Sequence, residues 1–96
     1  LIVLSDINGL YDSDPNTNSE AKLIPVVFRI DDRIRSIAGG VSSNRGTGGM
    51  VTKISAAEIA TEAGVHMIIA NGADPRILYR IFEGKQVGTL FLKKQK

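Results

Sequence analysis

The chain of 96 residues opens on an unbroken apolar run from Leu1 to Leu4. A run without polar alternation predicts a strand buried on both faces, which is typical of a parallel sheet. Such a strand needs a neighbouring strand on each side and helices above and below the sheet. Because 96 residues supply few of these partners, we expect the chain to be one part of a larger domain and to begin within it.

Helical and strand patterns alternate through the second half of the chain. Apolar runs predict strands at 1–4, 24–28, 65–70 and 88–92. Pro25 would place the second of these at a sheet edge, since proline cannot donate a ladder hydrogen bond. Helices are predicted at 31–38, 50–63 and 74–83, and glycines follow each of them. This order predicts an α/β fold with a mostly parallel sheet.

Composition excludes several classes of protein. Hydrophobic residues make up 43% and charged residues 23%, as in ordinary globular domains. The formal net charge is only +2. The chain has no cysteine, which excludes a disulfide framework and a cysteine-based metal site. The basic residues near the end form a weak tail without interleaved aromatic residues, so we expect no nucleic-acid partner. No apolar run is long enough for a membrane span, and we expect a cytoplasmic protein without a membrane partner.

A glycine-rich stretch, GTGGMVTK at 46–53, precedes the second predicted helix. Glycine allows close approach of the backbone to a ligand, and a helix start presents unpaired N–H groups to an anion. The spacing differs from a P-loop, because Met50 stands where that motif has lysine. It also differs from the dinucleotide fingerprint, because Val51 stands where the third glycine belongs. The stretch is therefore either a phosphate loop or a surface turn.

Lys53 favours the phosphate-loop interpretation. At about 100° per residue, an apolar stripe faces inward and a polar stripe faces outward. The inward stripe holds Ala56, Ala57, Ile59, Ala60 and Ala63. The outward stripe holds Ser55, Glu58, Thr61 and Glu62. Lys53 falls on the apolar side, one turn into the helix, so it either reaches out to water or points into a site at the helix mouth.

Further candidates follow the predicted strands. Asp6 comes directly after the first strand, where open α/β sheets bind ligands, although it could simply cap a turn. Asn71 and Gly72 form a turn at the same end of another strand. Tyr11 could be one wall of a base pocket or part of the core. The loop that contains Asp14 lacks the glycine and distal glutamate of a calcium site, so no metal site is predicted there.

Five segments together resemble one known family: SDINGLYDSDPNTN, IDDRIRSIAGG, GTGGMVTKISAAEIATEAGV, IIANG and GTLFL. They are similar to the carboxyl-terminal part of the glutamate 5-kinases, which belong to the amino-acid kinase family. The resemblance covers essentially the whole chain. Uridylate kinases and aspartokinases share an acidic stretch like the first segment. The pairing of IDD…AGG with GTGGMVTK is more specific to the glutamate 5-kinases.

The resemblance implies a three-layer αβα sandwich around a mainly parallel sheet, with residues 1–96 forming its ATP-binding portion. It implies transfer of the γ-phosphoryl group of ATP to the γ-carboxylate of L-glutamate, with Mg²⁺, in a homo-oligomeric enzyme (a dimer or tetramer). The family's amino-terminal glycine loop, first catalytic lysine and glutamate site have no counterpart in this sequence, so we expect the 96 residues alone to be inactive. There are two alternatives. One is a sister kinase that acts on uridylate or aspartate, and the other is a non-catalytic nucleotide-binding module.

The resemblance also implies roles for individual residues. Lys53 matches a catalytic lysine that touches the phosphates. Tyr11, Asp14 and Pro15 are expected to border the base or ribose. The positions that match nucleotide contacts are Ser5, Asp6, Thr47, Gly48, Gly49, Met50, Val51, Thr52 and Lys53.

Overall fold

A computed structural model describes residues 1–15, 17–40 and 49–94 of the chain. Its strands are β1 (Ile2–Ser5), β2 (Val26–Val27), β3 (Met67–Asn71) and β4 (Thr89–Phe91). Its helices are α1 (Asp32–Gly40), α2 (Met50–Glu62) and α3 (Ile77–Phe82). Each predicted segment forms the expected type of element. None of the helices in these ranges is both long and apolar enough to cross a membrane.

The strands form one sheet in the order β1-β3-β4-β2. β1 pairs in parallel with β3, and β2 pairs in parallel with β4. β3 and β4 are antiparallel, so the sheet is mixed rather than wholly parallel. The chain turns into β4 through Gly88, whose φ is +65° and whose missing Cβ would lie 1.9 Å from the Ile69 carbonyl oxygen. The predicted edge position of β2, next to Pro25, is confirmed.

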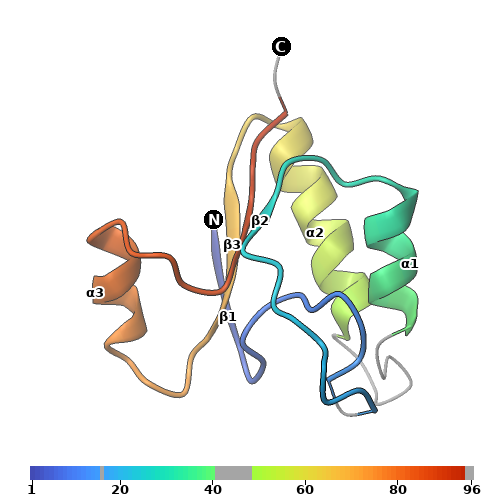
Figure 1. The fold of residues 1–96 in the computed structure, drawn as a ribbon. Coiled ribbons are helices and arrows are strands. Elements are labelled where there is room, and N and C mark those ends of the chain that lie inside the picture. Colours follow the sequence, from blue (N-terminus) through green and yellow to red (C-terminus); the bar gives the residue numbers. More distant parts are fainter. Residues whose placement is uncertain (16, 41–48, 95–96) are drawn as a thin grey trace.

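Helices cover both faces of the sheet (Figure 1). α1 and α2 lie on one face and α3 lies on the other, which gives the expected αβα layers. The main core lies between the sheet and α2, where Ile54 and Ala57 meet the fully buried Met67, Ile69 and Phe91. Burial of this apolar surface is what holds α2 against the strands.

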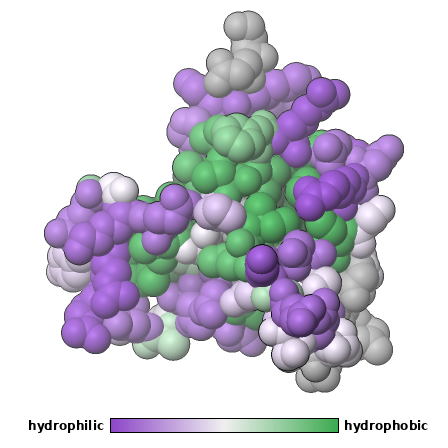
Figure 2. Space-filling view, in the orientation of Figure 1, coloured by the Kyte–Doolittle hydropathy of each residue, from purple (hydrophilic) through white to green (hydrophobic). Residues whose placement is uncertain are grey.

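Some large apolar side chains remain exposed in the described part of the chain. Apolar atoms gather in the middle of one face, with hydrophilic residues around them (Figure 2). The exposed large hydrophobic residues are Leu1, Leu4, Phe28, Val51, Ile59, Val65, Tyr79 and Phe82.

The inward face of α2 differs from the predicted stripe. Ile59 was expected to face inward but is 74% exposed, and Ala63 is exposed as well. Thr61 was expected to face outward but is only 8% exposed. Its hydroxyl donates to the Ala57 carbonyl at 2.8 Å, so its polar group is satisfied within the helix. The buried side of α2 therefore contains Met50 and the residues four and seven positions after it, Ile54 and Ala57. A prediction from apolar character alone misplaced part of this side.

The helix ends follow the predicted chemistry with shifts of a few residues. The Asp31 carboxylate accepts the Ile34 N–H at 3.1 Å and caps α1, but α1 continues through Gly40 instead of stopping before it. α2 ends as predicted, with Gly64 at φ +82°. The Gly64 N–H donates to Thr61 and the Val65 N–H donates to Ala60, which together form a Schellman motif.

α3 begins later than predicted. The expected start was Asp74-Pro75, whereas the helix starts at Ile77. The Asp74 carboxylate accepts the Arg76 N–H at 3.0 Å, and the Asp74 carbonyl accepts the Ile77 N–H at 3.0 Å. Asp74 thus caps a turn that precedes the helix instead of capping the helix itself.

Candidate functional site

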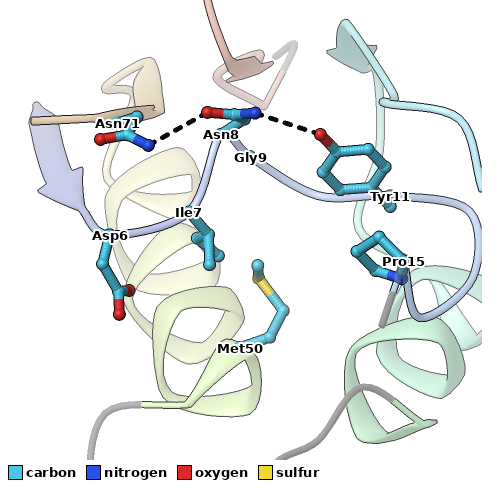
Figure 3. A pocket seen from close by; sticks show the side chains of 8 residues that line it. All are labelled: Asp6, Ile7, Asn8, Gly9, Tyr11, Pro15, Met50 and Asn71. Carbon is cyan, nitrogen blue, oxygen red and sulfur yellow. Dashed lines mark hydrogen bonds between the residues drawn. The ribbon is translucent and has the colours of Figure 1, made fainter. Parts of the chain in front are cut away.

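A pocket of about 210 Å³ lies at the carboxyl ends of β1 and β3 (Figure 3). This is the edge where open α/β sheets bind ligands, because helix starts and loops converge there. The volume is below the roughly 300–1,000 Å³ of sites for whole drug-sized ligands, so the pocket suits one part of a larger ligand. Its lining residues are Asp6, Ile7, Asn8, Gly9, Tyr11, Pro15, Met50 and Asn71.

Apolar groups form the walls of this pocket. Ile7, Met50 and Pro15 face the hollow, and the ring of Tyr11 stands beside Pro15 (Figure 3). Met50 is the first residue of α2 and is 4% exposed, so the helix start itself forms one wall. Apolar walls of this kind suit an aromatic heterocycle, whose faces are apolar and whose edge is polar.

Three side chains form a hydrogen-bonded relay along the polar side of the pocket (Figure 3). The Asn71 side-chain amide donates to Asn8 Oδ1 at 3.1 Å. The Asn8 amide in turn donates to the Tyr11 hydroxyl at 3.3 Å. Asn71 Oδ1 accepts the backbone N–H of Ala73 at 2.9 Å. The relay ties the end of β3 to the loop that follows β1, although 63 residues separate Asn8 from Asn71.

The loop behind the pocket is fastened to β4 through Thr89, which is fully buried. The Thr89 hydroxyl accepts the Leu10 N–H at 2.9 Å and donates to the Ile24 carbonyl at 2.6 Å. Gly9 lies against the same hydroxyl with φ +151°, and a Cβ there would come within 2.6 Å of it. Glycine is therefore required at this position, both for its backbone angle and for the close approach.

Asp6 lies between the pocket and a second, adjoining hollow. That hollow is lined by Leu4, Ser5, Asp6, Asn71, Gly72 and Ala73. The Ser5 hydroxyl donates to Asp6 Oδ1 at 3.3 Å, and the Ile7 N–H donates to the Ser5 hydroxyl at 3.3 Å. Asp6 is exposed, so its remaining oxygen positions can accept from a ligand or bind a cation.

No cluster of three metal-ligating side chains occurs in the part of the chain that the structure describes. Mg²⁺ in phosphoryl-transfer sites needs only one or two carboxylates, because phosphate oxygens and water complete its shell. Asp6 is the carboxylate that lines the pocket and the adjoining hollow. The donor set therefore fits a Mg²⁺ ion held mainly by the ligand's phosphates.

The structure brings together some of the predicted site residues. Asp6, Tyr11, Pro15 and Met50 line the pocket, and Ser5 lines the adjoining hollow. Gly49 is the N-cap of α2 beside them.

Other predicted residues do not line these two hollows. Val51 and Thr52 are exposed on the first turn of α2, and Lys53 is half-buried one residue further. Asp14 is half-buried in the loop after β1. Thr47 and Gly48 lie outside the described residues, so their predicted contacts stay predictions.

Sequence reasoning placed Asn71 at the ligand-binding edge of the sheet, where it lines the pocket, but it missed three other lining residues: Ile7, Asn8 and Gly9. Asn8 and Asn71 each stand at or just past the end of a strand, and these two strands are parallel neighbours in the sheet. The rule that ligands bind beyond the carboxyl ends of strands selected Asn71 and could have selected Asn8 as well. The sequence could not show that β1 and β3 pair, and that pairing brings the two side chains together.

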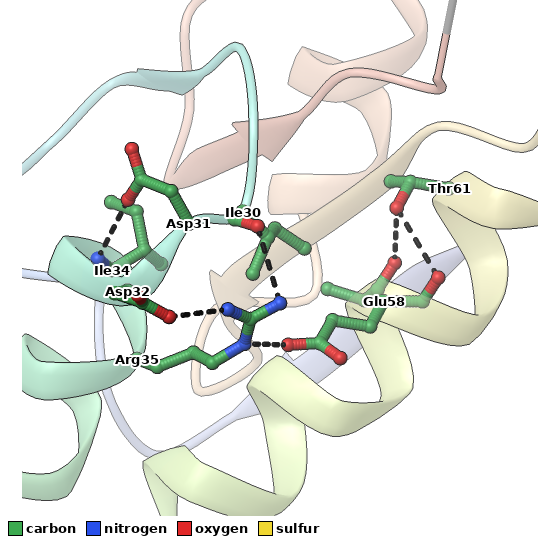
Figure 4. Close-up of polar contacts among 8 residues, drawn as sticks. Ile30, Asp31, Asp32, Ile34, Arg35, Glu58 and Thr61 are labelled. Atoms are coloured by element: carbon green, nitrogen blue, oxygen red, sulfur yellow. Dashed lines mark hydrogen bonds and ion pairs between the residues drawn. The ribbon is translucent and has the colours of Figure 1, made fainter.

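A third hollow, more polar and of about 500 Å³, lies at the opposite end of α2, and Figure 4 shows the polar contacts of Arg35, Glu58 and Thr61 there. We call it the ion-paired groove. Arg35 contributes to it and bonds Glu58 at 2.7 Å and Asp32 at 2.9 Å. The hydrogen bond that Arg35 donates to Glu58, followed by the negative charge of Glu58, raises the pKa of Arg35. The groove is lined by Phe28, Arg29, Ile30, Arg35, Glu58, Thr61, Glu62, Leu92 and Lys94.

Comparison with known proteins shows which family the chain belongs to. Residues 1–71 match the model of the amino acid kinase family. The glutamate 5-kinase of Clostridium perfringens (strain 13 / Type A) is 55% identical over 95 residues, which is 99% of this chain and 35% of that protein. The glutamate 5-kinase of Haemophilus influenzae (strain PittGG) is 54% identical over 95 residues, 99% of this chain and 26% of that protein. The chain thus spans about a quarter to a third of the length of these curated relatives.

Solved structures share the fold. The UMP kinase of Bacillus anthracis superposes with a TM-score of 0.63 at 22% identity, covering 98% of this chain and 34% of that one. The uridylate kinase of Archaeoglobus fulgidus gives a TM-score of 0.64 at 19% identity, covering 94% of this chain and 38% of that one. At such low identity the likeness concerns the fold alone. The expected αβα architecture and the expected similarity to glutamate 5-kinases are confirmed, and the chain belongs to the amino acid kinase family.

Proposed function

We propose that this chain forms the ATP-binding part of an enzyme that phosphorylates the γ-carboxylate of L-glutamate. The product would be glutamyl 5-phosphate, the first intermediate of proline biosynthesis. The observation that carries this proposal is the 55% identity to a glutamate 5-kinase over 95 of the 96 residues. The aligned region includes both strand ends and the start of α2, which are the elements that build the pocket.

The pocket supports the placement of the nucleotide. Its apolar walls suit the base, and Met50 joins it directly to the start of α2. The α2 start offers the positive end of a helix dipole to phosphates, and Gly49 before it carries no side chain that would obstruct their approach. In this proposal Tyr11 and Pro15 border the base, Asp14 lies near the base or ribose, and Thr47 to Thr52 surround the phosphates.

Charge compensation explains the role of Lys53. Phosphoryl transfer depends on positioning and on neutralising the charge of the transferred group. Both reactants are anions, so cations at the phosphates must offset their repulsion. Lys53 lies one turn into α2 and is proposed to contact the phosphates as the catalytic lysine. Mg²⁺ would be held by the phosphates together with Asp6, and it would supply further positive charge there.

The proposal extends to the setting of the enzyme. We place it in the cytoplasm as a homo-oligomer, with ATP and L-glutamate as its small-molecule partners. In this proposal it uses neither nucleic acid nor membrane as a partner.

An acceptor screen with the full-length protein tests the reaction. ADP formation from ATP and Mg²⁺ is followed with L-glutamate, L-aspartate or UMP as the acceptor. We expect turnover with glutamate alone. Turnover with aspartate or UMP instead would identify a sister kinase, and ATP binding without turnover of any acceptor would identify a non-catalytic nucleotide-binding protein. Either result would contradict the proposal.

A further inference from the structure

The relay of side chains along the pocket has a direction, and one backbone group sets it. The Ala73 N–H can only donate, so the Asn71 atom that it contacts at 2.9 Å must be the amide oxygen. The Asn71 nitrogen then faces Asn8 and donates to its oxygen at 3.1 Å. The Asn8 nitrogen in turn faces Tyr11 and donates to its hydroxyl at 3.3 Å. Each amide orientation follows from the one before it.

This direction decides what the Tyr11 hydroxyl can do. A phenol has one proton to donate and lone pairs with which to accept. Because Asn8 already donates to the Tyr11 oxygen, the phenolic proton is not used in the relay. Within the described residues no acceptor is recorded for that proton, and the Tyr11 ring lines the pocket. The relay therefore keeps Tyr11 as a hydrogen-bond donor for a bound molecule.

The pocket indicates which molecule would take this proton. Ile7, Met50 and Pro15 provide apolar walls for the faces of a flat ring (Figure 3). A hydroxyl donor at the rim then matches a ring with an acceptor atom on its edge. Adenine, the base of ATP, has three such ring nitrogens, at positions 1, 3 and 7.

We propose that Tyr11 donates a hydrogen bond to a ring nitrogen of the ATP base, and that Asn8 and Asn71 are positioning residues that hold Tyr11 as the donor. This inference rests on the proposed nucleotide site. It assigns base recognition to a pair of asparagines that are 63 residues apart in the chain. Neither asparagine needs to contact the base to have this effect.

Equilibrium binding to the full-length protein, without an acceptor, tests the contact directly. Binding of ATP and of its 1-deaza, 3-deaza and 7-deaza analogues is measured for the wild type and for Tyr11→Phe. One neutral hydrogen bond is worth about three- to tenfold in affinity, so Tyr11→Phe should weaken ATP binding by that factor. One deaza analogue should bind the wild type more weakly by the same factor, with no further loss in Tyr11→Phe. Tyr79→Phe is the matched control, because Tyr79 is 73% exposed on α3 and does not line the pocket.

A second variant tests the relay itself. In Asn71→Asp the atom facing Asn8 becomes an oxygen, so the Asn8 amide should turn and present its own oxygen to Tyr11. The phenolic proton would then be donated to Asn8 and lost to the ligand. We expect ATP affinity to fall about as much as in Tyr11→Phe, and the double variant to show little additional loss. Asn18→Asp is the matched control for the added charge, since Asn18 is exposed in the loop after β1.

The outcomes separate the two proposals. The proposed contact would be overturned if Tyr11→Phe bound ATP as tightly as the wild type does. It would also be overturned if, for every deaza analogue, the loss from the analogue and the loss from Tyr11→Phe were additive. Neither result would contradict the proposed phosphorylation of glutamate. Additive losses in the Asn71→Asp and Tyr11→Phe double variant would overturn the relay. Failure of the wild type to bind ATP would overturn the proposed function and this inference together. If circular dichroism shows that Asn71→Asp is unfolded, the deaza series with Tyr11→Phe still decides the contact.

Discussion

The two ends of α2 present very different surfaces. The helix is about 18 Å long at 1.5 Å per residue, and it runs from Met50 at the pocket to Thr61 and Glu62 at the ion-paired groove. At the pocket end the hydrogen bonds connect two neutral amides and a phenol, and the walls are apolar. At the groove end they join opposite charges, Arg35 with Glu58 and Lys94 with Glu62.

The difference shows which end is equipped to bind a ligand. In the groove Arg35 and Lys94 already have anions as partners, so these ion pairs mainly hold α1 and the tail after β4 onto α2. In the pocket the relay leaves donor capacity unused at Tyr11, and Asp6 is exposed. A large polar hollow in which ion pairs occupy most of the charged groups is therefore a weaker sign of function than a smaller hollow that keeps an unused hydrogen-bond donor.

The largest expected effect is at the pocket end of α2. Lys53→Ala in the full-length protein should lower kcat by about 10²–10³, because a preorganised positive charge at the phosphates is lost. The midpoint of thermal unfolding should change little. The measurement is steady-state ADP formation with glutamate, with Lys85→Ala, a lysine beyond α3, as the control. A Lys53→Ala enzyme of full activity would refute the assigned role.

The two buried threonines, Thr89 behind the pocket and Thr61 near the ion-paired groove, allow the two ends of α2 to be compared by their effect on stability. Thr89→Val should lower the free energy of unfolding by about 2–3 kcal/mol, since the Leu10 N–H and the Ile24 carbonyl lose their buried partner. Thr61→Val should cost no more than about 1 kcal/mol, because the Thr61 hydroxyl only adds a bond to a helical carbonyl. Urea unfolding of both variants measures the difference. A loss for Thr89→Val of no more than about 1 kcal/mol would show that the loop behind the pocket does not depend on Thr89.

A smaller effect is expected in the ion-paired groove. Arg35→Gln removes the pairs with Asp32 and Glu58, and both pairs are partly exposed. The unfolding temperature should fall slightly at low ionic strength and should match the wild type in about 1 M salt, where the Debye length is about 3 Å. ATP affinity should stay unchanged. A clear loss of ATP affinity would mean that the groove contributes to binding, and the contrast between the two ends would then be wrong.

The smallest effect concerns the turn after β3. The Arg76 side chain, and then its backbone N–H, hold the pKa of Asp74 below its ordinary value. A carboxyl with a lowered pKa in the folded state stabilises the fold above its unfolded pKa of about 3.9, and this contribution disappears as the pH falls through the lower folded value. We expect NMR titration to show this lowering of the Asp74 pKa. The Arg76→Gln variant should bring the pKa back toward its ordinary value, and no such return would contradict the assigned cause.

Much of the fold follows from local sequence alone. Asp31 caps α1, Gly64 ends α2, and Pro25 places β2 at an edge, because each of these depends on chemistry within a few residues. Asp6 could be selected for the same reason, since it follows an apolar strand. These features hold whatever the rest of the chain does.

Tertiary structure decided the remaining features, because they depend on which strands become neighbours. The pairing of β1 with β3 brings Asn71 to Asn8 and thereby creates the relay. The antiparallel return of β4 places Thr89 beneath the pocket loop. Packing against the sheet buried Thr61 and left Ile59 exposed, against the order of their hydrophobicities. The sequence determined the elements and their ends, whereas long-range pairing determined which side chains meet, since side chains distant in the chain touch only once the sheet has formed.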